Sequence, residues 1–340
     1  MKASRCCYKR VKIHRLSVFC CKISVLMGFH LGHIFALLTL AVVALASHAA
    51  LPVAQLYWNS VLPNTQMPKA ISELLQPAES VIEDKSTSVE VGNPDAYNKP
   101  PLFIQWQQPT ENHQLRGDAN AAALVFLEKN IRPGTTMNWP YARNTNTATF
   151  LPRRTAESIP FSSTKLPEIL KHFSLEPSSV EANTIKETIQ ECEAPGFKGE
   201  EKYCATSLES MIDFTTSKLG TSVEALISTE EEKEATMFMH KYTIMPGVKK
   251  LEGEKAVVCH KQNYPYAVFY CHAIKQTRTY VVPLVGADGV KAKAVAVCHI
   301  DTSEWSPKNL AFQVLKVKPG TIPICHFLPN GHIVWVPKSI

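Results

Sequence analysis

The chain has 340 residues with 45% hydrophobic and 19% charged side chains, which is typical of a globular protein and excludes a wholly disordered one. Its net charge of +6 comes from one end: residues 1–49 carry seven of the 36 basic residues and no acidic one, which leaves 29 bases against all 30 acids elsewhere. The rest of the chain lacks the positive charge of nucleic-acid-binding proteins, so we expect no nucleic-acid partner.

The first 49 residues have the pattern of a secretory signal peptide. A basic stretch precedes the apolar run Ile34–Ala46, and small residues follow it, with cleavage expected near Ala49. Because the basic stretch is longer than a signal peptide needs, Met27 is a candidate start of translation. The alternative is a signal anchor, since residues 23–50 carry no charge, but their densely apolar part is too short to span a bilayer alone. The leader predicts a secreted protein with no stable membrane span after cleavage.

Three parts follow the leader. Residues 50–75 form a short N-terminal segment, with one or two helical turns expected at Ile71–Leu75. Residues 76–120 are polar, contain several prolines and show no helical or strand periodicity, which predicts a linker. An ordered domain is expected over residues 121–340, beginning with a strand near Ala123–Leu127.

The first half of this domain is predicted to be helical. Ser178-x-x-Glu181 has the pattern of a capping box and starts a helix that should stop before Pro195-Gly196. A second helix is expected from Ser207 to just before Gly220.

From Lys241 onward the pattern is that of β-structure, with turn sequences between short runs of β-branched and aromatic residues. The expected strands are Val257-Val258, Val268–Tyr270, Tyr280–Val282, Ala294–Val297, Phe312–Val317 and Ile333–Val336. The chain is therefore predicted to be an α+β protein, with a helical first half of the domain followed by an antiparallel β-rich sandwich or partly open barrel.

Six cysteines remain after the leader, an even number that favours disulfides in an oxidising compartment. They are Cys192, Cys204, Cys259, Cys271, Cys298 and Cys325. Cys192 and Cys204 flank the turn between the two helices, and we favour a bridge there over two buried thiols. The six cysteines allow 15 connectivities, and the other pairings stay open.

The last four cysteines are each followed by histidine, at gaps of ten, 25 and 25 residues, and Trp335 follows the last pair after eight more. The pairs are Cys259-His260, Cys271-His272, Cys298-His299 and Cys325-His326. Each pair ends an apolar, β-prone run. Neighbouring side chains of a strand point to opposite faces, so if the four cysteines face one side, the four histidines face the other.

Histidines gathered on one face suggest a metal site, because neutral imidazole suits zinc, copper, iron and nickel. Zinc is disfavoured, since adjacent Cys-His on a strand cannot easily direct both side chains at one ion and the spacing is not that of a zinc finger. An all-histidine site outside the cell fits Cu(II) best. The alternative is structural: two disulfides staple the strands and the histidines are merely polar. His240 and His332 are further candidates, but a single histidine is more often a packing or surface residue, and Trp335 is expected in the core.

Other catalytic patterns are absent from the sequence, including nucleophile-elbow, zinc-protease, Walker A and dinucleotide-binding motifs. The run Glu230–Glu232 is typical of a solvated acidic loop rather than of a glycosidase carboxylate pair.

Four Cys-His pairs at these gaps, with Trp335 after the last, resemble the signature of the plant BURP domain. The resemblance covers the chain from about Ala123 to the C-terminus and includes further segments, namely Val125–Lys129, Ile159–Ser163, Glu200–Glu209 and Ala311–Lys316. The segment from Leu56 to Pro63 also resembles the stretch that follows the signal peptide in the dehydration-responsive and unknown-seed-protein branches.

The resemblance implies a protein of the apoplast, cell wall or vacuole that is associated with seed development or stress responses. One branch of the family accompanies a polygalacturonase as a non-catalytic subunit, and another consists of copper-dependent peptide cyclases that crosslink Tyr or Trp side chains. Carried over, the signature makes His260, His272, His299 and His326 the candidate copper ligands. Self-processing cyclases of one type carry Gln-Pro followed by five residues and Trp, a pattern that neither Gln76-Pro77 nor Gln108-Pro109 begins here.

The sequence thus leaves two functions open. The first is a mainly binding or structural component with a histidine metal site, whose partner is a wall polysaccharide or a wall enzyme. The second is a copper-dependent oxidative cyclase that acts on a peptide.

Overall fold

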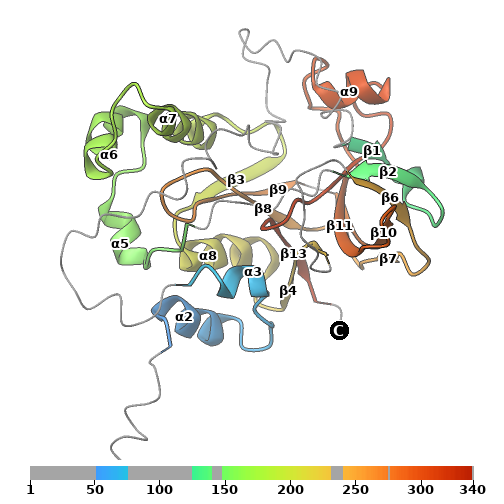
Figure 1. Ribbon diagram of the computed structural model, residues 1–340, viewed down its shortest axis with the longest axis horizontal. Coiled ribbons are helices and arrows are strands. Elements are labelled where there is room, and N and C mark those ends of the chain that lie inside the picture. Colours follow the sequence, from blue (N-terminus) through green and yellow to red (C-terminus); the bar gives the residue numbers. More distant parts are fainter. Residues whose placement is uncertain (1–50, 76–124, 140–147, 231–239, 275, 339–340) are drawn as a thin grey trace, which may run out of the picture. The chain divides into compact units, whose positions relative to one another are not determined.

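The computed structural model describes residues 51–75, 125–139, 148–230, 240–274 and 276–338. The predicted leader at 1–49 and linker at 76–120 lie outside these residues. In the described part of the chain, no helix is both long enough and apolar enough to cross a membrane. The α+β class is confirmed, because helices accompany two sheets in which all pairings of described strands are antiparallel (Figure 1).

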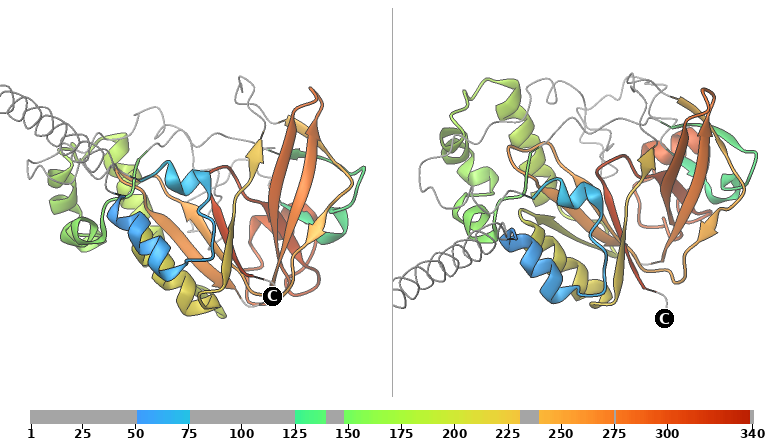
Figure 2. Two further views of the ribbon diagram at one scale, coloured as in Figure 1. Left: turned by 90° about the horizontal axis from the view of Figure 1, so that it is seen from below. Right: turned by 60° about the horizontal axis from the view of Figure 1, so that its bottom comes forward.

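One sheet has five strands in the order β3-β9-β8-β13-β4. Their bounds are β3 Glu200–Ala205, β4 Val223–Leu226, β8 Val257–Lys261, β9 Phe269–Ile274 and β13 Ile333–Pro337. Two helices cover one face of this sheet, α8 (Leu208–Leu219) and α2 (Val53–Val61), which lie side by side (Figures 1 and 2). The short helix α3 (Lys69–Ser72) follows α2, and its Ile71 is part of the same buried cluster.

The other sheet has eight strands, with β1-β12-β11-β10-β6-β2 in order, β5 beside β11 and β7 beside β10. Their bounds are β1 Val125–Leu127, β2 Thr136–Trp139, β5 Thr229–Glu230, β6 His240–Ile244, β7 Lys249–Lys250, β10 Thr277–Gly286, β11 Lys291–His299 and β12 Ile324–Phe327. This sheet curls into a half-barrel around its own apolar cluster, which includes Phe126, Tyr242, Leu284 and Phe327 (Figure 2).

A third apolar cluster joins the two sheets. Val258 and Val334 of the five-stranded sheet pack with Val295 and Val297 of the eight-stranded sheet, and all four are at most 2% exposed. Alternate residues of β8 and β11 therefore point toward the opposite sheet, and the residues between them point away from it.

The two predicted helices are present. The first, α7 (Val180–Glu193), begins one residue later than its capping-box pattern predicted, because Ser179 rather than Ser178 accepts the bond from the Ala182 N–H at 3.0 Å. The second, α8, is capped by Ser207 as expected, and Gly220 ends it with a φ of +79°, which favours glycine. The helices α5 (Arg153–Ser158) and α6 (Leu166–His172) precede them, together with the short 3₁₀ turns at Glu128–Asn130 and Ser163–Lys165.

The prediction of a strand at Phe312–Val317 is wrong, because Leu310–Leu315 form the helix α9. The Asn309 side chain caps this helix by accepting the N–H of Ala311 at 2.9 Å, and the left-handed Lys316 ends it. A short apolar run is compatible with either a strand or a buried helix. Here the Asn309 cap favours the helix.

The N-terminal segment packs into the same core as the domain. Trp58 of α2 is 1% exposed and packs at a tilt against the fully buried Trp335 with ring centroids 5.3 Å apart, while the Trp58 indole N–H donates to the Thr65 carbonyl at 2.9 Å. Trp335 is thus a core residue, and its own indole N–H has no hydrogen-bond partner among the described residues.

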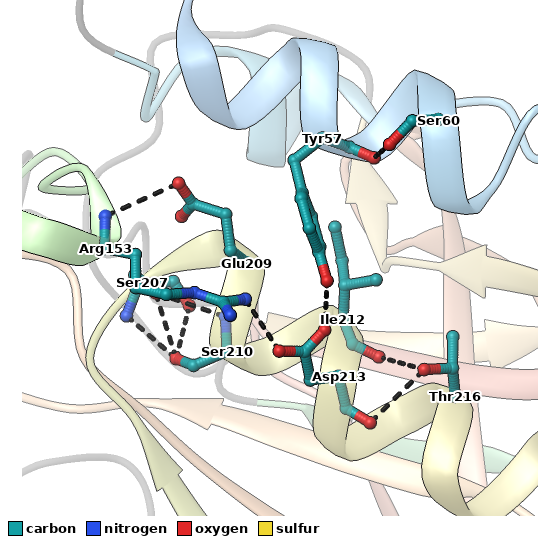
Figure 3. Close-up of polar contacts among 9 residues, drawn as sticks. All are labelled: Tyr57, Ser60, Arg153, Ser207, Glu209, Ser210, Ile212, Asp213 and Thr216. Carbon is teal, nitrogen blue, oxygen red and sulfur yellow. Dashed lines mark hydrogen bonds and ion pairs between the residues drawn. The ribbon is translucent and has the colours of Figure 1, made fainter.

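A polar cluster fixes α2 to α8 at the surface of this core. The Tyr57 hydroxyl donates to Oδ1 of Asp213, and the Arg153 guanidinium reaches Oδ2 of the same carboxylate at 2.7 Å (Figure 3). Arg153 also lies over the Tyr57 ring, 5.1 Å from its centroid. The hydrogen bond to Asp213, with a contribution from burial, raises the pKa of Tyr57. The residues 51–75 are therefore bound to the domain by apolar burial and by charge-assisted bonds.

Candidate metal centre

Two pairs of neighbouring strands carry the four Cys-His pairs in the same arrangement. In the five-stranded sheet Cys259 of β8 lies directly opposite Cys271 of β9, and a disulfide joins them. In the eight-stranded sheet Cys298 of β11 lies opposite Cys325 of β12, and a second disulfide joins these. Each disulfide points away from the other sheet: the first lies in the cluster under α8, and the second lies inside the curl of the half-barrel.

The third disulfide joins Cys192 of α7 to Cys204 of β3. The sequence placed both cysteines beside a turn, but Cys204 lies in a strand that the sequence analysis missed. This bridge ties α7 to the edge of the five-stranded sheet.

The four histidines occupy the opposite strand faces, where the two sheets meet. His260 and His272 come from the five-stranded sheet, and His299 and His326 come from the eight-stranded sheet. Neighbouring ring centroids are 5.2 to 6.2 Å apart, and each residue is between 1% and 7% exposed. Within each sheet, cysteines and histidines thus lie on opposite strand faces, as the sequence predicted. The structure also shows that the histidine pair of one sheet lies next to the histidine pair of the other, which the sequence did not predict.

The closest contact within the group joins the two histidines of the five-stranded sheet. The Nε2 atoms of His260 and His272 are 3.2 Å apart. The Nδ1 atom of each ring faces a further side chain: that of His260 lies 2.9 Å from Nδ1 of His332, and that of His272 lies 3.0 Å from Oε1 of Glu200.

The histidines of the eight-stranded sheet have different surroundings. Nδ1 of His326 lies 3.2 Å from the backbone carbonyl of Phe327, and Nδ1 of His299 is buried without a hydrogen-bond partner among the described residues. Trp305 packs against His299 with ring centroids 5.3 Å apart. Two side chains that the sequence did not indicate, Glu200 and Trp305, thus lie in direct contact with the group. His332, a minor candidate from the sequence, is a direct neighbour of His260.

A pocket opens beside these rings. Its walls include the four histidines together with Glu200, Tyr270, Trp305 and apolar side chains of β1, β9 and β12. Tyr270 is 1% exposed, and its hydroxyl donates to the same Glu200 oxygen that His272 approaches. The remaining candidate, His240, lies at the start of β6.

Burial lowers the pKa of four rings of the group, those of His260, His299, His326 and His332, and so favours their neutral form. Desolvation, reinforced by the neighbouring histidines, holds the pKa of His260 and His299 well below the usual value. Desolvation also lowers the pKa of His326 to about 4 and that of His332 to about 3. Burial alone would raise the pKa of Glu200, but its hydrogen bond and electrostatic interaction with His272, together with the hydrogen bonds from Phe197 and Tyr270, outweigh burial and lower this pKa. Neutral imidazole is the form that binds metals.

The donor chemistry fits a copper or zinc ion, and so does one distance. Two nitrogens bound to one tetrahedral ion at about 2.0–2.1 Å lie about 3.3 Å apart, close to the separation of the His260 and His272 Nε2 atoms. In the described residues, however, no three His, Cys, Asp or Glu side chains are already arranged to hold a metal ion. His260 and His272 already have nitrogens at this separation, and the other two rings would have to turn to complete a site.

Comparison with known proteins identifies the family. A family model described as the BURP domain matches residues 124–337. The chain belongs to the BURP domain family. It is 56% identical over 226 residues to BURP domain protein RD22 of Arabidopsis thaliana and 50% identical over 247 residues to BURP domain-containing protein 3 of Oryza sativa subsp. japonica. The matches cover 65% and 72% of this chain but only 57% of each relative.

A second rice relative is matched over most of its length. BURP domain-containing protein 5 is 41% identical over 302 residues, which is 86% of this chain and 89% of that protein. The BURP match begins within one residue of β1 and contains all four Cys-His pairs, whereas α2 and α3 precede it.

Proposed function

We propose that this BURP-domain chain is a secreted plant protein that binds copper through His260, His272, His299 and His326. In this role it acts mainly as a binding or structural component of the cell wall, the apoplast or a storage vacuole, in development or in the response to stress. A wall polysaccharide or a wall enzyme would be its partner.

One observation supports the copper site above all: four imidazoles from two sheets line one pocket, and two of them already present Nε2 atoms 3.2 Å apart. The cysteines that could compete as ligands are held in disulfides on the far faces of the strands. An all-nitrogen donor set without thiolates favours Cu(II) over the other first-row metals.

The residues around the proposed site would have different roles. His260 and His272 would hold the ion first, and His299 and His326 would close on it from the other sheet. The buried position of all four would keep water away from the ion, and burial lowers the pKa of His260, His299 and His326. The aromatic rings of Trp305 and Tyr270 would line the pocket beside the ion.

Metal content of the purified chain tests this proposal. We expect one copper per chain, and we expect the combined variant His260→Ala, His272→Ala, His299→Ala, His326→Ala to lose it, as measured by elemental analysis and by isothermal titration. His172→Ala is the matched control, because His172 is an exposed histidine of α6. Copper that stays stoichiometric in the fourfold variant would contradict the ligand assignment.

A second function, oxidative crosslinking of a peptide, is favoured by the aromatic pocket beside the four histidines. Cu(II) would supply the one-electron oxidation of a Tyr or Trp side chain, with dioxygen as the final electron acceptor. The pocket residues would hold the aromatic ring next to the ion and keep it from solvent.

Mass spectrometry separates the two functions. The copper-loaded chain is incubated in air with a peptide of its own residues 76–124, which include Tyr97 and Trp106. Loss of two hydrogens from the peptide, absent with the fourfold histidine variant, would support the cyclase. An unchanged peptide in the presence of bound copper would support the binding role.

A further inference from the structure

Four buried side chains form one continuous row across the five-stranded half of the site. His332 faces His260 at 2.9 Å between Nδ1 atoms, His260 faces His272 at 3.2 Å between Nε2 atoms, and His272 faces Glu200 at 3.0 Å from Nδ1 to Oε1. The three histidines are between 1% and 7% exposed, and the Glu200 side chain is 1% exposed. The row joins β3, β9 and β8 to the residue that precedes β13.

Glu200 occupies the accepting end of this row. Its Oε1 accepts the Tyr270 hydroxyl at 3.2 Å, and its Oε2 accepts the backbone N–H of Phe197 at 3.3 Å. A carboxylate in this role has no hydrogen to give, so Nδ1 of His272 must be the donor in their 3.0 Å contact. A neutral imidazole has one N–H, which leaves the Nε2 atom of His272 as a bare lone pair directed at His260.

The proton on His272 decides the protons on the next two rings. Without an ion, the 3.2 Å contact requires His260 to donate from Nε2, which leaves its Nδ1 bare. His332 must then donate from its Nδ1 across the 2.9 Å contact. The three tautomers are thus coupled, and Glu200 sets their direction.

We propose that Glu200 and His332 are positioning residues of the histidine site, Glu200 by fixing His272 as a ligand through Nε2 and His332 by giving His260 a partner in either of two tautomers. This proposal rests in part on the proposed copper site. An ion held by both Nε2 atoms needs both lone pairs, which places the proton of His260 on Nδ1, where His332 accepts it. The proton of His332 then resides on its Nε2, and the three rings carry the same number of protons as before.

The two rings of the eight-stranded half have different neighbours. His326 is held by a backbone carbonyl that no substitution of a side chain removes, and His299 has no partner at Nδ1 among the described residues. The two positioning residues therefore act on His260 and His272. They do not set the tautomers of His299 and His326.

Nitrogen NMR of histidine-labelled, metal-free full chain is the first test, because it reports which ring nitrogen carries the proton. We expect His272 in the Nδ1–H form in the wild type and in Glu200→Gln, whose side-chain carbonyl can still accept the bond. We expect the Nε2–H form in Glu200→Ala. Glu201→Ala is the matched control: Glu201 is the next residue of β3, has an exposed side chain and pairs with Lys218.

Copper titration of the same variants is the second test. Loss of a side chain that orients a ligand costs about 10–100-fold in metal affinity, so we expect that loss in Glu200→Ala and in His332→Phe, and no change in Glu201→Ala. A wild-type chain that binds no copper contradicts the proposed function but leaves the tautomer result standing. A wild-type or Glu200→Gln chain with the His272 proton on Nε2 overturns the positioning role, even if Glu200→Ala fails to fold. Unchanged copper affinity in Glu200→Ala and His332→Phe overturns it as well.

Discussion

The two halves of the histidine site have the same strand arrangement but different surroundings. In each half a cross-strand disulfide lies on one face of an antiparallel pair and two histidines lie on the other. The five-stranded half has its disulfide covered by helices and its histidine Nδ1 atoms directed at the side chains of His332 and Glu200. The eight-stranded half has its disulfide covered by the curl of its own sheet, and Nδ1 of His326 lies beside the backbone carbonyl of Phe327.

The comparison shows that the repeated Cys-His unit does not by itself determine the environment of its histidines. One half is fixed by partners from distant parts of the chain, since Glu200 and His332 lie 72 residues from the histidines they face. In the other half, the Nδ1 atom of His299 has no hydrogen-bond partner among the described residues, and its ring packs against Trp305.

The largest effect is expected where the N-terminal helix covers the five-stranded half. Trp58→Ala removes a side chain that is 1% exposed and packs against Trp335, and we expect a loss of about 3–5 kcal/mol in the free energy of unfolding. Urea unfolding measures the loss, and hydrogen exchange should show it in β8, β9 and β13 rather than in β10 and β11. Leu56→Ala, at a position of the same helix that is 52% exposed, is the control and should cost little.

Removing either of the two cross-strand disulfides tests whether the two sheets unfold independently or as one unit. Removing Cys259–Cys271, at a sequence separation of 12, should cost about 3 kcal/mol, and removing Cys298–Cys325, at a separation of 27, about 3.5 kcal/mol in the chain-entropy account. Paired Cys→Ala variants in urea unfolding measure this. Each loss should lower exchange protection in its own sheet, and equal loss of protection in both sheets would show that the halves are one cooperative unit.

Removing the third disulfide is the control for that test. The pair Cys192→Ala, Cys204→Ala should cost about 3 kcal/mol in stability as well, since it closes a loop with the same separation of 12. Because this bridge lies at the edge of the five-stranded sheet, we expect copper affinity to remain at the wild-type value.

A buried acid gives the five-stranded half a pH dependence that can be isolated. Burial raises the pKa of Glu191 from 4.5 to about 7, and its Oε1 has no hydrogen-bond partner among the described residues. Between these two values the folded chain keeps a proton that the unfolded chain has lost, so stability falls as pH rises from 4.5 to 7. Glu191→Gln cannot ionise, so we expect its free energy of unfolding to exceed that of the wild type by about 2 kcal/mol at and above pH 7. This value is smaller than the full pKa shift implies, because Glu191 is partly exposed to solvent, which screens its charge.

Unfolding in urea across this pH range provides the measurement. The difference between Glu191→Gln and the wild type should be near zero at pH 4.5 and should grow toward pH 7. Glu187→Gln, an exposed position of the same helix, is the control. A difference that does not change with pH would place the ionisation of Glu191 at its ordinary value.

The smallest effect concerns the polar cluster that fixes α2 to α8. Tyr57→Phe removes the hydroxyl that donates to Asp213 and should cost about 1 kcal/mol in the free energy of unfolding. Tyr203→Phe, at a residue that is 42% exposed, is the control. Because burial of Trp58 contributes most of the binding of α2, a loss in Tyr57→Phe as large as that in Trp58→Ala would contradict this ranking.

Local patterns predicted a large part of this fold. Ser207 and Gly220 marked both ends of α8, and the β-branched runs marked β8, β9, β10, β11 and β13. Alternation along the strands placed cysteines and histidines on opposite faces. These features depend on neighbours within a few residues, which the sequence shows directly.

The remaining features depend on contacts between distant residues. No local pattern indicates that β3 brings Glu200 to His272, or that the turn before β13 brings His332 to His260. The helix α9 was mistaken for a strand because its short apolar run has no periodicity of its own. The position of α2 on α8 also escaped prediction, since a polar stretch of about 50 residues separates α2 from the domain.

The attachment of α2 has a topological consequence for that stretch. Leu75 and Val125, the described residues on either side of it, belong to the same folded body, and the Leu74 carbonyl accepts the Phe150 N–H at 2.7 Å. The two described ends that flank residues 76–124 are therefore attached to one folded body. After a single proteolytic cut between them, we expect the N-terminal piece to stay bound to the domain through Trp58.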